Sequence, residues 1–99
     1  MRAPVTILVV LFASSTLAGC KKKANAKECD ALLERFSELV VRERFPDAGA
    51  AQRKGEQDRE KVEARGDDNF KNCTSEVQAE ELACAMAAAN SEALKKCLE

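Results

Sequence analysis

A chain of 99 residues that lacks histidine cannot form a Ser-His or Cys-His nucleophile, a histidine metal site or a histidine haem ligand. Its 16 basic and 17 acidic residues give a net charge of −1, which does not favour nucleic-acid binding. The length corresponds to one small domain, and four phenylalanines are its only aromatic residues, so we expect a small hydrophobic core.

The first residues have the layout of the precursor of an exported protein. Arg2 is the only charge ahead of an apolar run over residues 5–12, which has the length of a signal-peptide core. The apolar segment over residues 5–19 is too short to span a bilayer as a helix. A cleaved signal peptide is therefore the main prediction, and a short uncleaved membrane anchor is the alternative.

Leu17-Ala18-Gly19-Cys20 ends this segment and resembles the bacterial lipobox. The resemblance implies cleavage before Cys20 and attachment of acyl chains such as palmitate to that cysteine, which becomes the lipid anchor. In well-studied lipoproteins an aspartate at the next position retains the product in the inner membrane. Because Lys21 stands there, the resemblance implies the outer membrane, facing the periplasm, or the cell surface beyond it.

Three segments follow from this interpretation. Residues 1–19 form the signal peptide, residues 20–27 a lipidated tether, and residues 28–99 a disulfide-linked helical domain. The tether could extend ~23 Å from the lipid. Its run Lys21-Lys22-Lys23 would either bind an anionic lipid surface or serve as a hydrated spacer.

Apolar residues recur at helical spacing beyond the tether, so we expect an all-α fold, a small bundle of three to four helices. Pro46 should end the first helix, with Asp47 capping the second and Gly66 ending it. Ser75 and Gln78 fit a capping box at the start of the third. The expected helices cover residues 27–44, 48–65, 75–89 and 91–98.

An even number of cysteines in an exported chain indicates disulfides, and four follow the lipobox: Cys29, Cys73, Cys84 and Cys97. The alternative, a four-cysteine metal site, usually needs a closely spaced pair, which this chain lacks. An antiparallel hairpin turning at residues 90–91 places Cys84 opposite Cys97. On one helix Cys73 and Cys84 would lie ~16 Å apart, too far for a bridge. Of the three connectivities we favour Cys29 with Cys73 and Cys84 with Cys97.

The sequence predicts no catalytic, cofactor-binding or metal-ligating residue. The adjacent acids Glu80-Glu81 and Asp67-Asp68 are typical of solvated helix surface and of turns. The segment that starts at Asp67 does not fit a calcium loop, because Lys71 occupies a position where an oxygen ligand is needed. We expect no cofactor, no nucleic acid and no small-molecule substrate.

Residues 84–90 (Cys-Ala-Met-Ala-Ala-Ala-Asn), with Leu94, Cys97 and Leu98, resemble the end of small uncharacterised cysteine-containing lipoproteins of Gram-negative bacteria. That resemblance implies no activity. The predicted function is a non-enzymatic, membrane-anchored periplasmic binding or adaptor lipoprotein, and the alternative is a structural or envelope-maintenance lipoprotein without a specific partner. The expected partners are the membrane, through acyl chains on Cys20, and another envelope protein. An adaptor should expose a contiguous apolar patch, on the first helix and the C-terminal hairpin.

Overall fold

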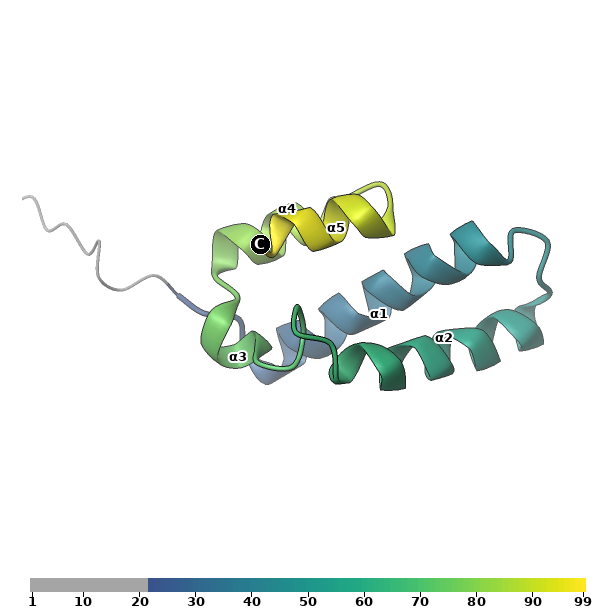
Figure 1. Cartoon of the computed structure of the whole chain (residues 1–99), viewed down its shortest axis with the longest axis horizontal. Coiled ribbons are helices and arrows are strands. Elements are labelled where there is room, and N and C mark those ends of the chain that lie inside the picture. Colours follow the sequence, from purple (N-terminus) through teal and green to yellow (C-terminus); the bar gives the residue numbers. More distant parts are fainter. Residues whose placement is uncertain (1–21) are drawn as a thin grey trace, which may run out of the picture.

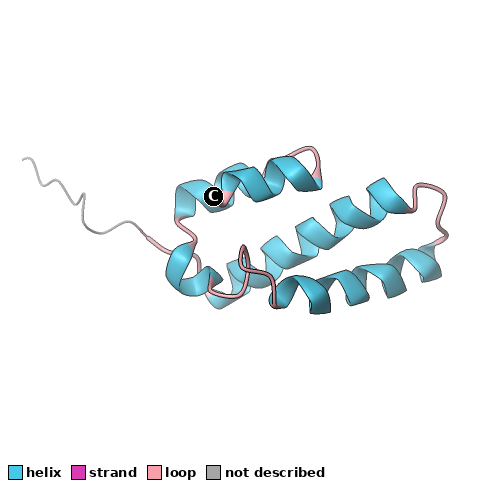
Figure 2. Ribbon diagram, in the orientation of Figure 1, coloured by secondary structure: helices cyan, strands magenta, loops and turns pink. Residues whose placement is uncertain are grey.

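The structure is a computed structural model that describes residues 22–99. The predicted signal peptide over residues 1–19 and the predicted lipid anchor Cys20 lie outside the described residues. Within them, the chain contains an isolated antiparallel bridge between Lys23 and Gln78 but no β-strand. The all-α prediction is therefore confirmed (Figure 2). The helices are α1 (Ala26–Arg44), α2 (Ala50–Arg65), α3 (Cys73–Glu76), α4 (Ala79–Met86) and α5 (Ser91–Cys97).

The long helix α1 is the centre of the bundle, because it contacts each of the other four helices. Helix α2 runs back along one side of α1, and α4 and α5 form a hairpin on the other side (Figure 1). The short helix α3 lies at the end of the bundle where the described chain begins, and the turn between α1 and α2 lies at the opposite end.

Both ends of α1 follow from local sequence. Asn25 caps its start, since the side chain accepts from the Glu28 N–H at 2.8 Å and the Glu28 carboxylate accepts from the Asn25 N–H at 3.0 Å. At its end Phe45 is the C-cap, and its N–H donates to the Val41 carbonyl at 2.7 Å. The helix stops there because Pro46 disfavours helical geometry in the residue before it, as predicted.

The hydrophobic core lies between α1 and the C-terminal half of the chain. Leu32 and Leu94 are fully buried in it. The rings of Phe36 and Phe70 pack with their centroids 4.8 Å apart, so the loop after α2 is fastened to α1. The other large members of the core are Leu33, Leu39, Val40, Val77 and Leu82.

The prediction of one helix over residues 75–89 is wrong. Val77 has an extended backbone (φ −83°, ψ 119°) and separates α3 from α4. The start of α4 is capped at Gln78, whose N–H donates to the Glu81 carboxylate at 2.9 Å. The predicted capping box at Ser75 is also wrong, because that hydroxyl donates to the Asn72 carbonyl at 3.1 Å. The extended residue is needed because residues 77–79 pair with the start of the described chain.

That pairing makes residues 22–24 part of the folded domain. The Ala24 N–H donates to the Val77 carbonyl, and the Ala79 N–H donates to the Lys22 carbonyl, both at 2.9 Å. Ala24 is only 3% exposed. The folded unit thus begins no later than Lys22, whereas the sequence placed its start at residue 28, after a tether.

Helix α2 is the least buried of the long helices. It starts two residues later than predicted, with Gly49 as N-cap in place of Asp47, because the Ala48 N–H turns back to the Phe45 carbonyl at 3.1 Å. It ends at Gly66, as predicted. Only two of its 16 residues, Glu60 and Ala64, are buried.

Candidate functional site

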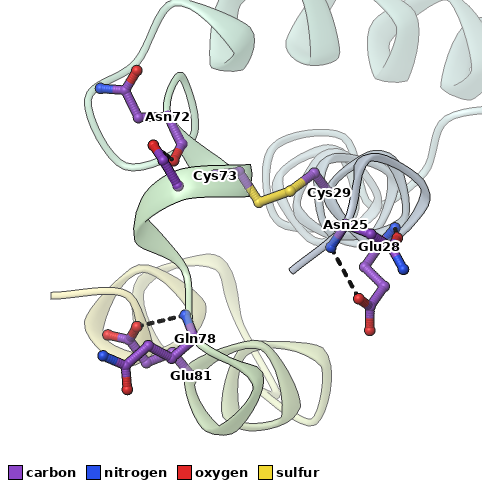
Figure 3. Close-up of a disulfide and its surroundings, with 8 residues drawn as sticks. Asn25, Glu28, Cys29, Asn72, Cys73, Gln78 and Glu81 are labelled. Carbon is purple, nitrogen blue, oxygen red and sulfur yellow. Dashed lines mark hydrogen bonds between the residues drawn. A yellow bond between two sulfur atoms is a disulfide. The ribbon is translucent and has the colours of Figure 1, made fainter. Parts of the chain in front are cut away.

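Two disulfides hold the bundle, and both join the cysteines that the spacing favoured. Cys29 is bonded to Cys73, with Cα atoms 6.0 Å apart, and Cys84 to Cys97, with Cα atoms 5.7 Å apart. The first bond ties α3 to the start of α1, between the capping pairs at Asn25 and Gln78 (Figure 3). The second closes the α4–α5 hairpin.

The two disulfides differ in their access to solvent. Cys29 and Cys73 are buried in the core, at 9% and 6% exposure. Cys84 is exposed and Cys97 is half-buried on the surface of the hairpin. Because thiol–disulfide exchange needs access to a sulfur atom, only the Cys84–Cys97 bond is open to a thiol in the folded protein.

The interface between α1 and α2 is largely polar. Glu60 is buried and accepts from Arg44 at 2.8 Å, although the Arg44 side chain is itself 63% exposed. Lys61 donates to the Glu34 carboxylate at 2.7 Å. This hydrogen bond raises the pKa of Lys61 above its ordinary value, which favours the charged ammonium. Polar pairs rather than apolar side chains therefore make up much of the contact between these helices.

A groove of about 190 Å³ opens where α1, α2 and α5 meet. Both of its cations face acids: Arg44 pairs with Glu60, and the Lys95 ammonium lies 3.8 Å from the Asp67 carboxylate. Lys95 also lies over the Phe36 ring, 5.3 Å from its centroid. The cations of the groove thus link α1 to α2 and α5 to the turn after α2, which is a structural role.

The acidic pair Asp67-Asp68 organises the turn after α2, as its sequence context predicts. Asp67 accepts from the Asn69 N–H at 2.9 Å. Asp68 pairs with Lys71 at 2.7 Å, and hydrogen bonding to that lysine lowers the pKa of Asp68 and raises the pKa of Lys71. In the other acidic pair, Glu81 caps α4. Among residues 22–99, no group of three or more Cys, Asp or Glu side chains could hold a metal ion.

The apolar residues of the first helix and the C-terminal hairpin, from which we expected a contact patch, form the core instead. In the part of the chain that the structure describes, the large hydrophobic side chains that are exposed are Val62 (70%) and Met86 (38%). They lie on α2 and α4, two helices that do not contact each other. No described helix is both long enough and apolar enough to span a membrane.

Among the polar contacts between elements, the sequence did not predict the docking of residues 22–24 or the burial of Glu60. The first had a readable signal, since Gln78 and Glu81 have capping-box spacing and Val77 precedes them. The second had none, because Glu60 lies in a run of alternating charges that is typical of a solvated face.

Comparisons with known proteins found no matching family model, no similar curated protein and no similar solved structure.

Proposed function

We propose that this chain is a lipid-anchored, non-enzymatic protein of the bacterial cell envelope, which binds another envelope protein through its helical domain. Its acylated Cys20 would hold it at the outer membrane, facing the periplasm. The observation that carries the anchor is the lipobox-like run Leu17-Ala18-Gly19-Cys20 at the end of a short apolar segment.

The cysteine pairing supports this anchor. The chain has five cysteines, and four of them are joined in the bonds Cys29–Cys73 and Cys84–Cys97. Cys20 therefore has no cysteine left to pair with inside the chain. Its thiol is available for acylation, and the two disulfides fit an oxidising compartment outside the cytoplasm.

Helix α2 is the best candidate for the surface that binds a partner. Of the other helices it contacts only α1, and all of its residues except Glu60 and Ala64 are at least partly exposed. It also carries Val62, the most exposed large hydrophobic residue of the described chain. An apolar side chain within a charged, accessible helix suits a polar, reversible protein interface.

The anchor is tested by growing cells with a clickable fatty acid. The wild-type protein should be labelled and float with membranes. Cys20→Ala should remain unlabelled and keep residues 1–19, as judged by intact mass. A control that removes a disulfide cysteine, Cys84→Ser, should still be labelled. Equal labelling of wild type and Cys20→Ala would refute the anchor.

The binding role is tested by in-cell crosslinking and mass spectrometry. Crosslinks to one protein should centre on α2, and Val62→Ser should reduce them, whereas Met86→Ser on α4 should not. Crosslinks that do not change in Val62→Ser would refute α2 as the surface. Absence of any protein crosslink would favour the alternative, a structural or envelope-maintenance lipoprotein that has no specific partner.

A further inference from the structure

The described chain is fixed to the fold from its first residues. The Lys22 carbonyl accepts from the Ala79 N–H, and the Ala24 N–H donates to the Val77 carbonyl. Ala24 is buried, and the next residue, Asn25, caps α1. No flexible tether therefore separates Lys22 from the core.

This docking shortens the reach of the anchor. A tether over residues 20–27 would have let the domain stand ~23 Å from the lipid, whereas the two residue steps from Cys20 to Lys22 extend to at most ~7 Å. If Cys20 is held at a bilayer surface, the end of the bundle where Lys22 enters must lie at that surface as well.

That end of the bundle is polar and carries free ammonium groups. Lys22, Lys23 and Lys27 are exposed, and none of them forms an ion pair with another described residue. The carboxylates of Glu28 and Glu81 are held by the backbone N–H groups that they cap. The remaining acids nearby in the chain are Asp30, which is exposed, Glu76, which accepts from the Asn72 amide at 3.3 Å, and Glu80.

The opposite end of the molecule is far from this entry point. Helix α1 has 19 residues, and at 1.5 Å per residue it is ~28 Å long. The turn between α1 and α2 lies at its far end, and the first half of α2, with Lys54, lies beside that turn (Figure 1).

We infer that the domain rests on the lipid headgroup layer with the end that carries Lys22, Lys23, Lys27 and α3, and that the α1–α2 turn points away from the bilayer. The inference rests on the proposed acylation of Cys20. The ammonium groups of the three lysines donate to the phosphate oxygens of the lipids. The first half of α2 is then the part of the domain most accessible to a partner.

The experiment uses the lipoprotein purified from cell membranes and reconstituted into vesicles of phosphatidylethanolamine and phosphatidylglycerol. A water-soluble acylating reagent modifies its lysines, and peptide mass spectrometry gives the rate at each site in vesicles and in detergent. In vesicles, labelling of Lys22, Lys23 and Lys27 should slow by about fivefold. Lys54, whose side chain is 80% exposed, should react at the same rate in both.

The matched control inserts eight Gly and Ser residues between Lys21 and Lys22, which leaves the lipobox-like run and every lysine unchanged. The insertion adds up to ~26 Å of reach, so the three lysines should regain the rates seen in detergent. Intact mass of the same samples reports the acyl chains on Cys20.

The outcomes separate the two proposals. Acylated protein whose Lys22, Lys23 and Lys27 react as fast in vesicles as in detergent would overturn the inference and leave the anchor standing. Protection that persists in the insertion variant would also overturn it, because the short connection would not be the cause. Protein without acyl chains on Cys20 would refute the proposed function and the inference with it.

Discussion

Single residues and short turns decide where the helices of this fold begin and end. Pro46 and Gly66 end their helices as sequence rules predict, since their effect is local. Asp47 fails as a cap because the Phe45–Ala48 turn delays the start of α2, and that turn depends on where α2 meets α1. Residue-scale prediction thus succeeds where the cause lies within a few residues.

Arg44→Met tests the buried end of the α1–α2 interface. The substitution leaves the Glu60 carboxylate buried without its cation, so the free energy of unfolding should fall by about 1–2 kcal/mol. Urea denaturation measures the change. The control Lys54→Met removes an exposed pair with Asp58 and should cost less than about 0.5 kcal/mol. Equal losses in the two variants would contradict the role given to Glu60.

The Asp68–Lys71 pair predicts a pH effect at the turn after α2. Hydrogen bonding to Lys71 lowers the pKa of Asp68 below its ordinary value of 3.8. The stabilisation by this carboxylate is therefore present above pH 3.8 and disappears as the pH falls through the lowered pKa. Carboxyl NMR titration should find a midpoint below 3.8 for Asp68 in the wild type.

Lys71→Met should return the midpoint of Asp68 toward its ordinary value, because the hydrogen bond and the positive charge are both lost. Lys54→Met, on α2, should leave the midpoint of Asp68 unchanged. A midpoint that stays low in Lys71→Met would show that another group causes the shift.

At the scale of helices, prediction from the sequence depended on whether an element is stabilised locally. The periodic apolar residues of α1 defined its span to within one residue, since residues 27–44 were expected and Ala26–Arg44 is observed. The span expected over residues 75–89 was wrong, because the break at Val77 is caused by pairing with residues 22–24, more than fifty positions away.

A glycine-to-alanine substitution in α2 tests how backbone entropy affects the stability of a single helix. Gly55 is an exposed position in the helix interior, its φ is not positive, and a Cβ atom built there meets nothing within 4 Å. Gly55→Ala should therefore raise the free energy of unfolding by about 0.5–1 kcal/mol, because alanine loses less backbone entropy on folding. Thermal denaturation followed by circular dichroism measures it.

Gly66→Ala is the matched control for this substitution. Gly66 lies at the C-cap of the same helix, where an added Cβ would approach the Glu63 carbonyl at 3.7 Å. Its melting temperature should change less than that of Gly55→Ala, since the residue is outside the helix interior. A destabilised Gly55→Ala would mean that α2 is not a regular helix at this position.

For the whole molecule, the sequence predicted the disulfide pairing better than the noncovalent contacts between segments. Symmetric placement about residues 90–91 was enough to pair Cys84 with Cys97, and elimination then paired Cys29 with Cys73. The docking of residues 22–24 could not be predicted from those residues themselves, because two lysines and an alanine carry no apolar pattern. The candidate partner-binding surface on α2 could likewise be identified only from the burial of residues in the structure.

The two disulfides should therefore differ in reactivity and in their contribution to stability. Limited dithiothreitol should reduce Cys84–Cys97 first, because its sulfur atoms are near the surface, while Cys29–Cys73 stays oxidised in the core. Helix content should persist at that stage, since Leu94 remains buried and Glu43 accepts from the N–H and hydroxyl of Ser91 at the start of α5. Trapping of the new thiols and peptide mapping identify the bond that opens.

Double serine variants measure how much each disulfide contributes to the free energy of unfolding. In the chain-entropy view the stabilisation grows with the enclosed loop, so removal of the bond across 13 residues should cost about 3 kcal/mol and removal of the bond across 44 residues about 4 kcal/mol. The free energy of unfolding of the Cys29→Ser/Cys73→Ser variant should fall by more than the loop length alone suggests. This variant also places two hydroxyl groups in the core that contains Phe36 and Phe70. It should unfold well below the melting temperature of Cys84→Ser/Cys97→Ser. If the hairpin variant is the less stable one, α5 and not the link between α1 and α3 holds this bundle together.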